Sequence, residues 1–141
     1  MQMKGWTAAI AGLLLGLSWA TLAGQSATTV KDGVYTDEQA KRGQSGYTGK
    51  CSACHGDDLN GAGFAPALNG DTFAQSWLDR KLDEFVARIK DTMPADKPGS
   101  LTPEMNADIV AFLLKSNGYP AGTRELPTEG ADLQQITITK P

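Results

Sequence analysis

The two cysteines and the single histidine of the chain stand within five residues, as Cys51, Cys54 and His55. Two thiols at this spacing can each add to a vinyl group of one porphyrin, and the adjacent imidazole can then bind the iron, so Cys-x-x-Cys-His is typical of covalent haem attachment. A thioredoxin-like redox motif would need an α/β pattern, a structural zinc site would need a fourth ligand, and a disulfide over so short a loop would stabilise little. We therefore predict one haem c, attached through Cys51 and Cys54, with His55 as an axial ligand of the iron.

The opposite face of the iron needs another kind of ligand, because the chain has no second histidine. A methionine thioether is the usual alternative and raises the reduction potential. Of the four methionines, Met1 and Met3 belong to an apolar N-terminal segment, and Met105 falls on the apolar face of a predicted helix, where packing explains it. Met93 falls in a predicted loop, 38 residues after His55, next to a proline. We predict Met93 as the second axial ligand, with Met105, water or a non-methionine ligand as alternatives.

The N-terminal segment has the pattern of an export signal. Lys4 precedes an apolar run of about 16 residues, and small residues follow up to Ala23. We predict a signal peptide over residues 1–23, cleaved near Ala23, and therefore a periplasmic protein. An uncleaved membrane anchor is the alternative, although the run is shorter than the roughly 20 residues that span a bilayer.

The charge of the remaining chain limits its partners. Cleavage after residue 23 would remove one of the 13 basic residues and none of the 16 acidic ones, which leaves a formal charge of −4. A mildly acidic domain is a poor binder of nucleic acid and of anionic lipid. We expect redox proteins as partners, no nucleic acid, and no stable membrane insertion unless the N-terminal segment is retained.

The residues before the Cys-x-x-Cys-His motif have the sequence features of a helix. Thr36 can cap a helix, with Gln39 three residues later to close a capping box, and the spacing of apolar residues predicts a helix to about Tyr47. Gly43 lies in the middle of this helix, where glycine costs about 1 kcal/mol relative to alanine. We therefore expect another helix to pass close to Gly43.

The elements after the motif follow from the same rules. Residues 49–70 are loop-like and rich in glycine, and a loop of this length in a compact domain should hold something bulky. A short helix is predicted over residues 72–77, and an amphipathic helix from Leu78 to Ile89. After an irregular stretch over residues 92–101, a last helix begins after Thr102 and stops at Asn117.

These signals predict an all-α domain of three to five helices, because we find no internal repeat and no strand–helix–strand pattern. The domain itself would cover residues 36–119. It would follow a flexible, Ser/Thr-rich lead over residues 24–35 and precede a C-terminal tail over residues 120–141, in which residues 135–139 could be extended.

Together these motifs resemble the class I c-type cytochromes over about residues 35–119. The match rests on the Cys51–Gly56 peptide, on Pro66-Ala67-Leu68, on Thr92-Met93-Pro94 and on the closing amphipathic helix. The resemblance implies the class I fold around one haem, and a hydrogen bond from His55 Nδ1 to the carbonyl of Pro66, which would make the imidazole a stronger ligand.

The resemblance also implies that the first and last helices cross at Gly43 and Tyr47, with Phe112 as the facing residue on the last helix. Four further residues would pack against the haem or belong to the ordinary core: Leu59, Leu68, Trp77 and Ile89. More narrowly, the chain is similar to the small periplasmic cytochromes that serve PQQ-dependent dehydrogenases.

We therefore expect an electron carrier and not an enzyme, which passes one electron between a dehydrogenase and a downstream cytochrome or oxidase. Two alternatives stay open. The chain could be a fixed haem subunit of a larger oxidoreductase complex, with the tail over residues 120–141 as the feature to test. It could also be a haem enzyme with a labile sixth ligand, acting on peroxide or a sulfur compound.

Overall fold

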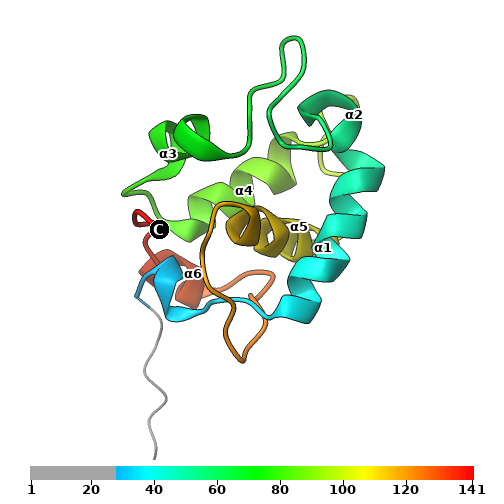
Figure 1. Ribbon diagram of the computed structural model, residues 1–141. Helices are drawn as coiled ribbons and strands as arrows, with labels where there is room; N and C mark the ends of the chain where they lie inside the picture. The colour runs from blue at the N-terminus through cyan, green and yellow to red at the C-terminus, as the bar shows by residue number, and fades with distance from the viewer. Residues whose placement is uncertain (1–27) are drawn as a thin grey trace, which may run out of the picture.

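The computed structural model describes residues 28–141, so the predicted signal peptide and the first part of the predicted lead lie outside the described residues. Over this range the chain is helical, and its only β-type pairings are isolated bridges. The elements, shown in Figure 1, are the 3-10 turn η1 (Val30–Asp32) and the helices α1 (Asp37–Lys50), α2 (Ser52–His55), α3 (Gly70–Trp77), α4 (Leu82–Thr92), α5 (Pro103–Ser116) and α6 (Ala131–Gln135).

The predicted all-α class is confirmed for the described residues. Four helices have eight or more residues, and α2 and α6 are single turns of four and five residues. No helix among residues 28–141 is both long enough and apolar enough to cross a membrane.

The core of the domain is the crossing of α1 and α5. A Cβ atom on Gly43 would overlap the backbone carbonyl of Asp108, so the two helices touch backbone to backbone at this point. One turn later, the rings of Tyr47 and Phe112 pack with centroids 5.2 Å apart. Close helix approach is therefore the reason for the mid-helix glycine, as the sequence predicted.

The start of α1 differs from the prediction in one respect. Thr36 caps the helix, because its Oγ1 accepts a hydrogen bond from the backbone N–H of Gln39 at 3.1 Å. The side chain of Gln39 does not complete a capping box. Instead it is buried and bonds both peptide groups of Leu126: Nε2 donates to the carbonyl at 3.0 Å, and Oε1 accepts from the N–H at 2.7 Å.

The described part of the predicted flexible lead is packed into the domain. Val30 and Tyr35 have no exposed surface. Backbone hydrogen bonds join this segment to the tail, from Val30 N–H to the Thr137 carbonyl at 3.1 Å and from Thr137 N–H to the Thr28 carbonyl at 2.9 Å. The first and last parts of the described chain therefore lie side by side, as the blue and red ends of Figure 1 show.

The tail contributes to the core over most of its length. Its apolar side chains Leu126, Leu133, Ile136 and Ile138 are all buried. It also bonds the segment between α3 and α4, because the carbonyl of Ile138 accepts from Asp79 N–H at 2.8 Å. The predicted extended segment over residues 135–139 is limited to isolated bridges of Thr137 with Thr29 and Lys81.

The fourth helix begins later than predicted. Its apolar spacing places Leu78 on the same face as Leu82, but Leu78 ends α3 and α4 starts only at Leu82. Asp79 has a φ of 64°, a left-handed conformation that interrupts a right-handed helix. The apolar period continues across this break because Leu78 still packs against the core.

Candidate haem-attachment site

The predicted attachment peptide folds as one helical turn at the end of α1. Cys51 lies between α1 and α2, and its N–H donates to the carbonyl of Tyr47 at 2.8 Å. Within the turn, His55 N–H donates to the Cys51 carbonyl at 2.9 Å. Both cysteines are free thiols, Cys51 half-buried and Cys54 exposed, while His55 is buried.

The state of these thiols argues against a disulfide-exchange motif. Burial and the neighbouring Cys54 raise the pKa of Cys51 to about 11. Reactive Cys-x-x-Cys thiols have a lowered pKa, because the thiolate is the nucleophile. Among residues 28–141 no group of three or more His, Cys, Asp or Glu side chains is placed to hold a metal ion. The raised pKa of Cys51 therefore does not favour a disulfide-exchange motif, and residues 28–141 contain no cluster of zinc ligands.

The imidazole of His55 is oriented by the loop that follows it. Its Nδ1 lies 2.8 Å from the carbonyl oxygen of Pro66. A backbone carbonyl can only accept, so Nδ1 carries the hydrogen, and in the neutral imidazole Nε2 then has the lone pair. Such a contact fixes both the tautomer and the plane of a metal-binding histidine. The ring is therefore prepared to bind a metal through Nε2.

Gly61 makes this approach of Pro66 to His55 sterically possible. It has a φ of 79°, and a Cβ at this position would lie 2.8 Å from the N–H of Ala67. Its own N–H donates to the carbonyl of His55 at 2.8 Å. In the sequence, Gly61 is only one of the glycines of the loop-like residues 49–70, and no local pattern shows that it bonds the loop to the histidine.

Asn117 supports the same loop from the C-terminal end of α5. Its Nδ2 donates to the carbonyl of Leu68 at 3.0 Å, and Leu68 N–H donates to the carbonyl of Leu59 at 2.8 Å. The sequence predicted Asn117 only as the end of a helix. Its contact with the loop spans 49 residues, and no local pattern signals it.

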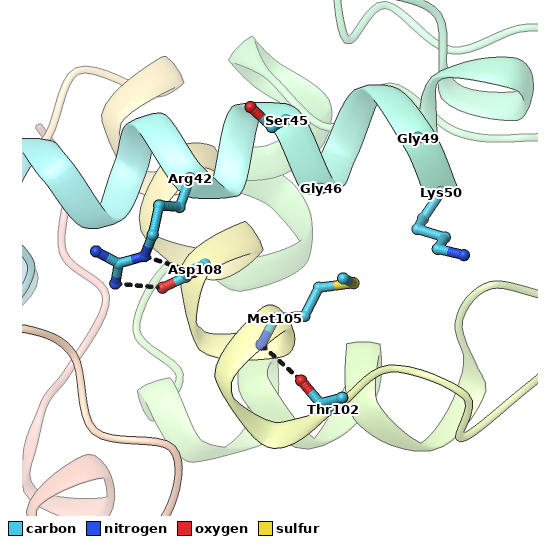
Figure 2. A pocket seen from close by; sticks show the side chains of 8 residues that line it. All are labelled: Arg42, Ser45, Gly46, Gly49, Lys50, Thr102, Met105 and Asp108. Atoms are coloured by element: carbon cyan, nitrogen blue, oxygen red, sulfur yellow. Dashed lines mark hydrogen bonds and ion pairs between the residues drawn. The ribbon is translucent and has the colours of Figure 1, made fainter.

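The two candidate methionine ligands occupy different places. Met93 lies directly after α4, where its N–H donates to the carbonyl of Ile89 at 3.0 Å, and its half-buried side chain packs against the core. Met105 points into a hollow of about 460 Å³ between α1 and α5, shown in Figure 2. Met105 packs against the core at the helix crossing, so close to α1 that a Cβ added to Gly46 would lie 3.5 Å from its Cγ.

The other predicted haem-packing residues divide into two groups. Leu59 and Ile89 are buried, whereas Leu68 and Trp77 are half-buried at the edge of the core. Trp77 packs on Phe85 with ring centroids 4.6 Å apart. The exposed edges of Leu68 and Trp77 leave apolar surface that a large apolar group could cover.

The residues present fit a covalently attached haem. Two unbonded thiols and an imidazole with a free Nε2 are held on one helical turn, and a glycine-rich loop returns over the histidine. Cys51, Cys54 and His55 could thus hold the haem, with Pro66 orienting His55.

Comparison with known proteins gives three findings. The family model described as cytochrome c oxidase, cbb3-type, subunit III matches residues 38–113, which is more than half of the chain and runs from α1 into α5. Thiosulfate dehydrogenase of Stutzerimonas stutzeri (strain A1501) is 34% identical over 89 residues, which cover 59% of this chain and 29% of that protein.

A solved structure has the same fold. The crystal structure of the sulfane dehydrogenase SoxCD from Paracoccus pantotrophus aligns with a TM-score of 0.58 and 22% identity, over 82% of this chain and 61% of the solved chain. The chain therefore spans less than a third of its curated relative and less than two thirds of the solved chain.

Proposed function

Because this chain belongs to the family described as cytochrome c oxidase, cbb3-type, subunit III, we propose that it is a single-haem electron carrier of the periplasm. It has a class I c-type cytochrome fold, which implies covalent haem c and supports electron transfer. We further propose that the chain carries one haem and passes one electron between a dehydrogenase and a downstream cytochrome or oxidase.

The observation that carries this proposal is the contact between His55 and Pro66 on a turn with two free thiols. Bound haem supplies an iron that gains and loses one electron. Cys51 and Cys54 would hold it covalently, and His55 would bind the iron through Nε2. The hydrogen bond from Nδ1 keeps the imidazole in one orientation, so little rearrangement accompanies a change of charge.

Met93 is the proposed ligand on the opposite face of the iron. It is half-buried at the end of α4, whereas Met105 packs between α1 and α5. A thioether ligand raises the reduction potential, and an iron bound on both faces has no open site for a substrate. These features favour a carrier over an enzyme.

A second function is favoured by the names of the two relatives. Thiosulfate dehydrogenase and sulfane dehydrogenase act on sulfur compounds, and each is longer than this chain. The chain could therefore be a haem subunit of a larger complex, or an enzyme with a labile sixth ligand that oxidises a sulfur compound. The periplasmic location is part of the same proposal and rests on the predicted signal peptide over residues 1–23.

Mass spectrometry of the protein from its native compartment tests the central claim. We expect the mass of one haem added to a chain that begins near residue 24. A mass without haem would contradict the proposal, and a mass that retains residues 1–23 would contradict the predicted cleavage alone.

The optical spectrum of the oxidised protein tests the second ligand. A weak far-red band marks sulfur ligation, and we expect Met93→Ala to abolish it while Met105→Leu retains it. If Met93→Ala left both the band and the potential unchanged, Met93 would not be the ligand. An open sixth site would appear as a missing band in the unaltered protein.

The choice between a carrier and a subunit needs the intact chain. Deleting the tail would expose Leu133, Ile136 and Ile138, which are buried, so loss of a partner after deletion could reflect unfolding. Purification of the native protein as a lone haem protein favours the carrier. Purification in a stable complex with a dehydrogenase or an oxidase favours the subunit.

A further inference from the structure

We propose that Tyr47 is a positioning residue for the haem-attachment turn, because it fastens both ends of α2. Its carbonyl accepts a hydrogen bond from Cys51 N–H at 2.8 Å, immediately before the turn. Its hydroxyl donates to the carbonyl of Gly56 at 2.6 Å, immediately after the turn. One residue of α1 thus holds the two peptide groups that border the attachment peptide.

The turn needs this support because it is short. Four residues form a single helical turn, and isolated helices of this length are not stable in water. Gly56 then leaves the helix with a φ of 78°. The position of its carbonyl therefore decides where the following loop begins.

The loop transmits that position to the imidazole. It runs from Gly56 to Pro66, and its middle is bonded back to the turn, because Gly61 N–H donates to the His55 carbonyl at 2.8 Å. Its far end places the Pro66 carbonyl 2.8 Å from Nδ1 of His55. Tyr47 would therefore act on the iron ligand through the backbone and not by direct contact.

The hydroxyl of Tyr47 stays a donor and keeps one partner. The side chain is 1% exposed, and its ring is fixed against Phe112 at the crossing of α1 and α5. Burial first, and then the nearby charges of Asp57 and Asp58, raise the pKa of Tyr47 to about 12. A buried hydroxyl without an acceptor is costly, so the bond to Gly56 is strongly favoured.

Tyr35 provides a matched control. It is fully buried, and its hydroxyl donates to the carbonyl of Tyr119 at 2.6 Å, which is the same kind of bond in a part of the domain that does not touch α2. Tyr47→Phe and Tyr35→Phe each keep the ring and remove one hydroxyl. Any difference between the two variants at the haem site then comes from the place of the lost bond.

Amide hydrogen exchange of the purified haem protein tests the proposal. In Tyr47→Phe we expect the amides of His55, Gly56 and Gly61 to exchange about five-fold faster relative to amides of α4, as the loss of one hydrogen bond implies. We also expect a shift of the reduction potential. Tyr35→Phe should change neither the exchange ratio nor the potential.

Two results would overturn the proposal. One is an unchanged exchange ratio in Tyr47→Phe, and the other is an equal rise in Tyr35→Phe, which would make the hydroxyl of Tyr47 an ordinary source of stability. The ratio to α4 separates a local effect from a general loss of stability. The consequence for the iron rests on the proposed function, which fails separately if the unaltered protein carries no haem.

Discussion

Three glycines on one helix allow the helix crossing to be tested by a single kind of substitution. Gly43, Gly46 and Gly49 follow one another at intervals of three residues along α1, at increasing distance from α5. A Cβ on Gly43 would overlap the carbonyl of Asp108, whereas one on Gly46 would lie 3.3 Å from Cγ1 of Ile109. A Cβ on Gly49 would meet nothing within 4 Å.

The expected magnitudes follow from what each methyl group meets. Alanine gains roughly 1 kcal/mol over glycine inside a helix, so Gly49→Ala should stabilise the domain by about 0.5–1 kcal/mol. At Gly46 the obstacle is a side chain that can shift, and the gain and the cost should cancel to within about 0.5 kcal/mol. At Gly43 the obstacle is backbone, so α1 and α5 must separate, and a gap of about 1 Å forfeits up to half of each dispersion contact.

We therefore expect Gly43→Ala to destabilise the domain by about 3 kcal/mol, at the upper end of the usual cost of overpacking. Urea unfolding followed by circular dichroism, with the haem attached in all three variants, gives the free energies of unfolding. A loss below about 1 kcal/mol for Gly43→Ala would refute the backbone contact. A loss of stability in Gly49→Ala would refute the open space around that residue.

Two further substitutions test the buried polar contacts. Gln39→Leu should destabilise the domain by about 2–4 kcal/mol, because the N–H and the carbonyl of Leu126 would stay buried without partners. As a control, Gln44→Leu at an exposed position of the same helix should change stability by less than about 0.5 kcal/mol. Equal losses of stability in urea unfolding of the two variants would contradict the contact. Burial raises the pKa of Tyr35 to about 12. The phenol therefore stays neutral to a higher pH in the folded state than in the unfolded state, where tyrosine ionises near pH 10. The contribution of Tyr35 to stability is therefore complete below pH 10 and is lost as the pH rises toward 12, and Tyr35→Phe should flatten the fall in unfolding free energy over this range; parallel curves would refute this.

The sequence predicted those elements whose signals are local. Thr36 and Thr102 cap α1 and α5 in the structure, and the attachment peptide is a contiguous motif. Gly43 indicated a close contact with another helix, because a glycine in the middle of a helix is unfavourable and such a contact compensates for that cost. All of these inferences depend on residues a few positions apart, where propensity and spacing are informative.

The contacts that the sequence did not reveal join distant segments. Gln39 satisfies the capping-box pattern with Thr36, but its side chain bonds Leu126, 87 residues away, because a buried peptide with two free groups is the stronger partner. The hydroxyl of Tyr47 likewise has no sequence signal, since phenylalanine would fit the same aromatic position. Only the fold brings that oxygen to Gly56.

The pairing of Thr28 with Thr137 has a consequence for how the chain folds. The two residues are 109 positions apart, and contacts over such separations close slowly because the loop between them must first be ordered. Val30 and Ile138, one from each end of the described chain, are both fully buried. A chain that is still being synthesised therefore cannot complete its core before residue 138 is available, and we expect the two ends to pair late in folding.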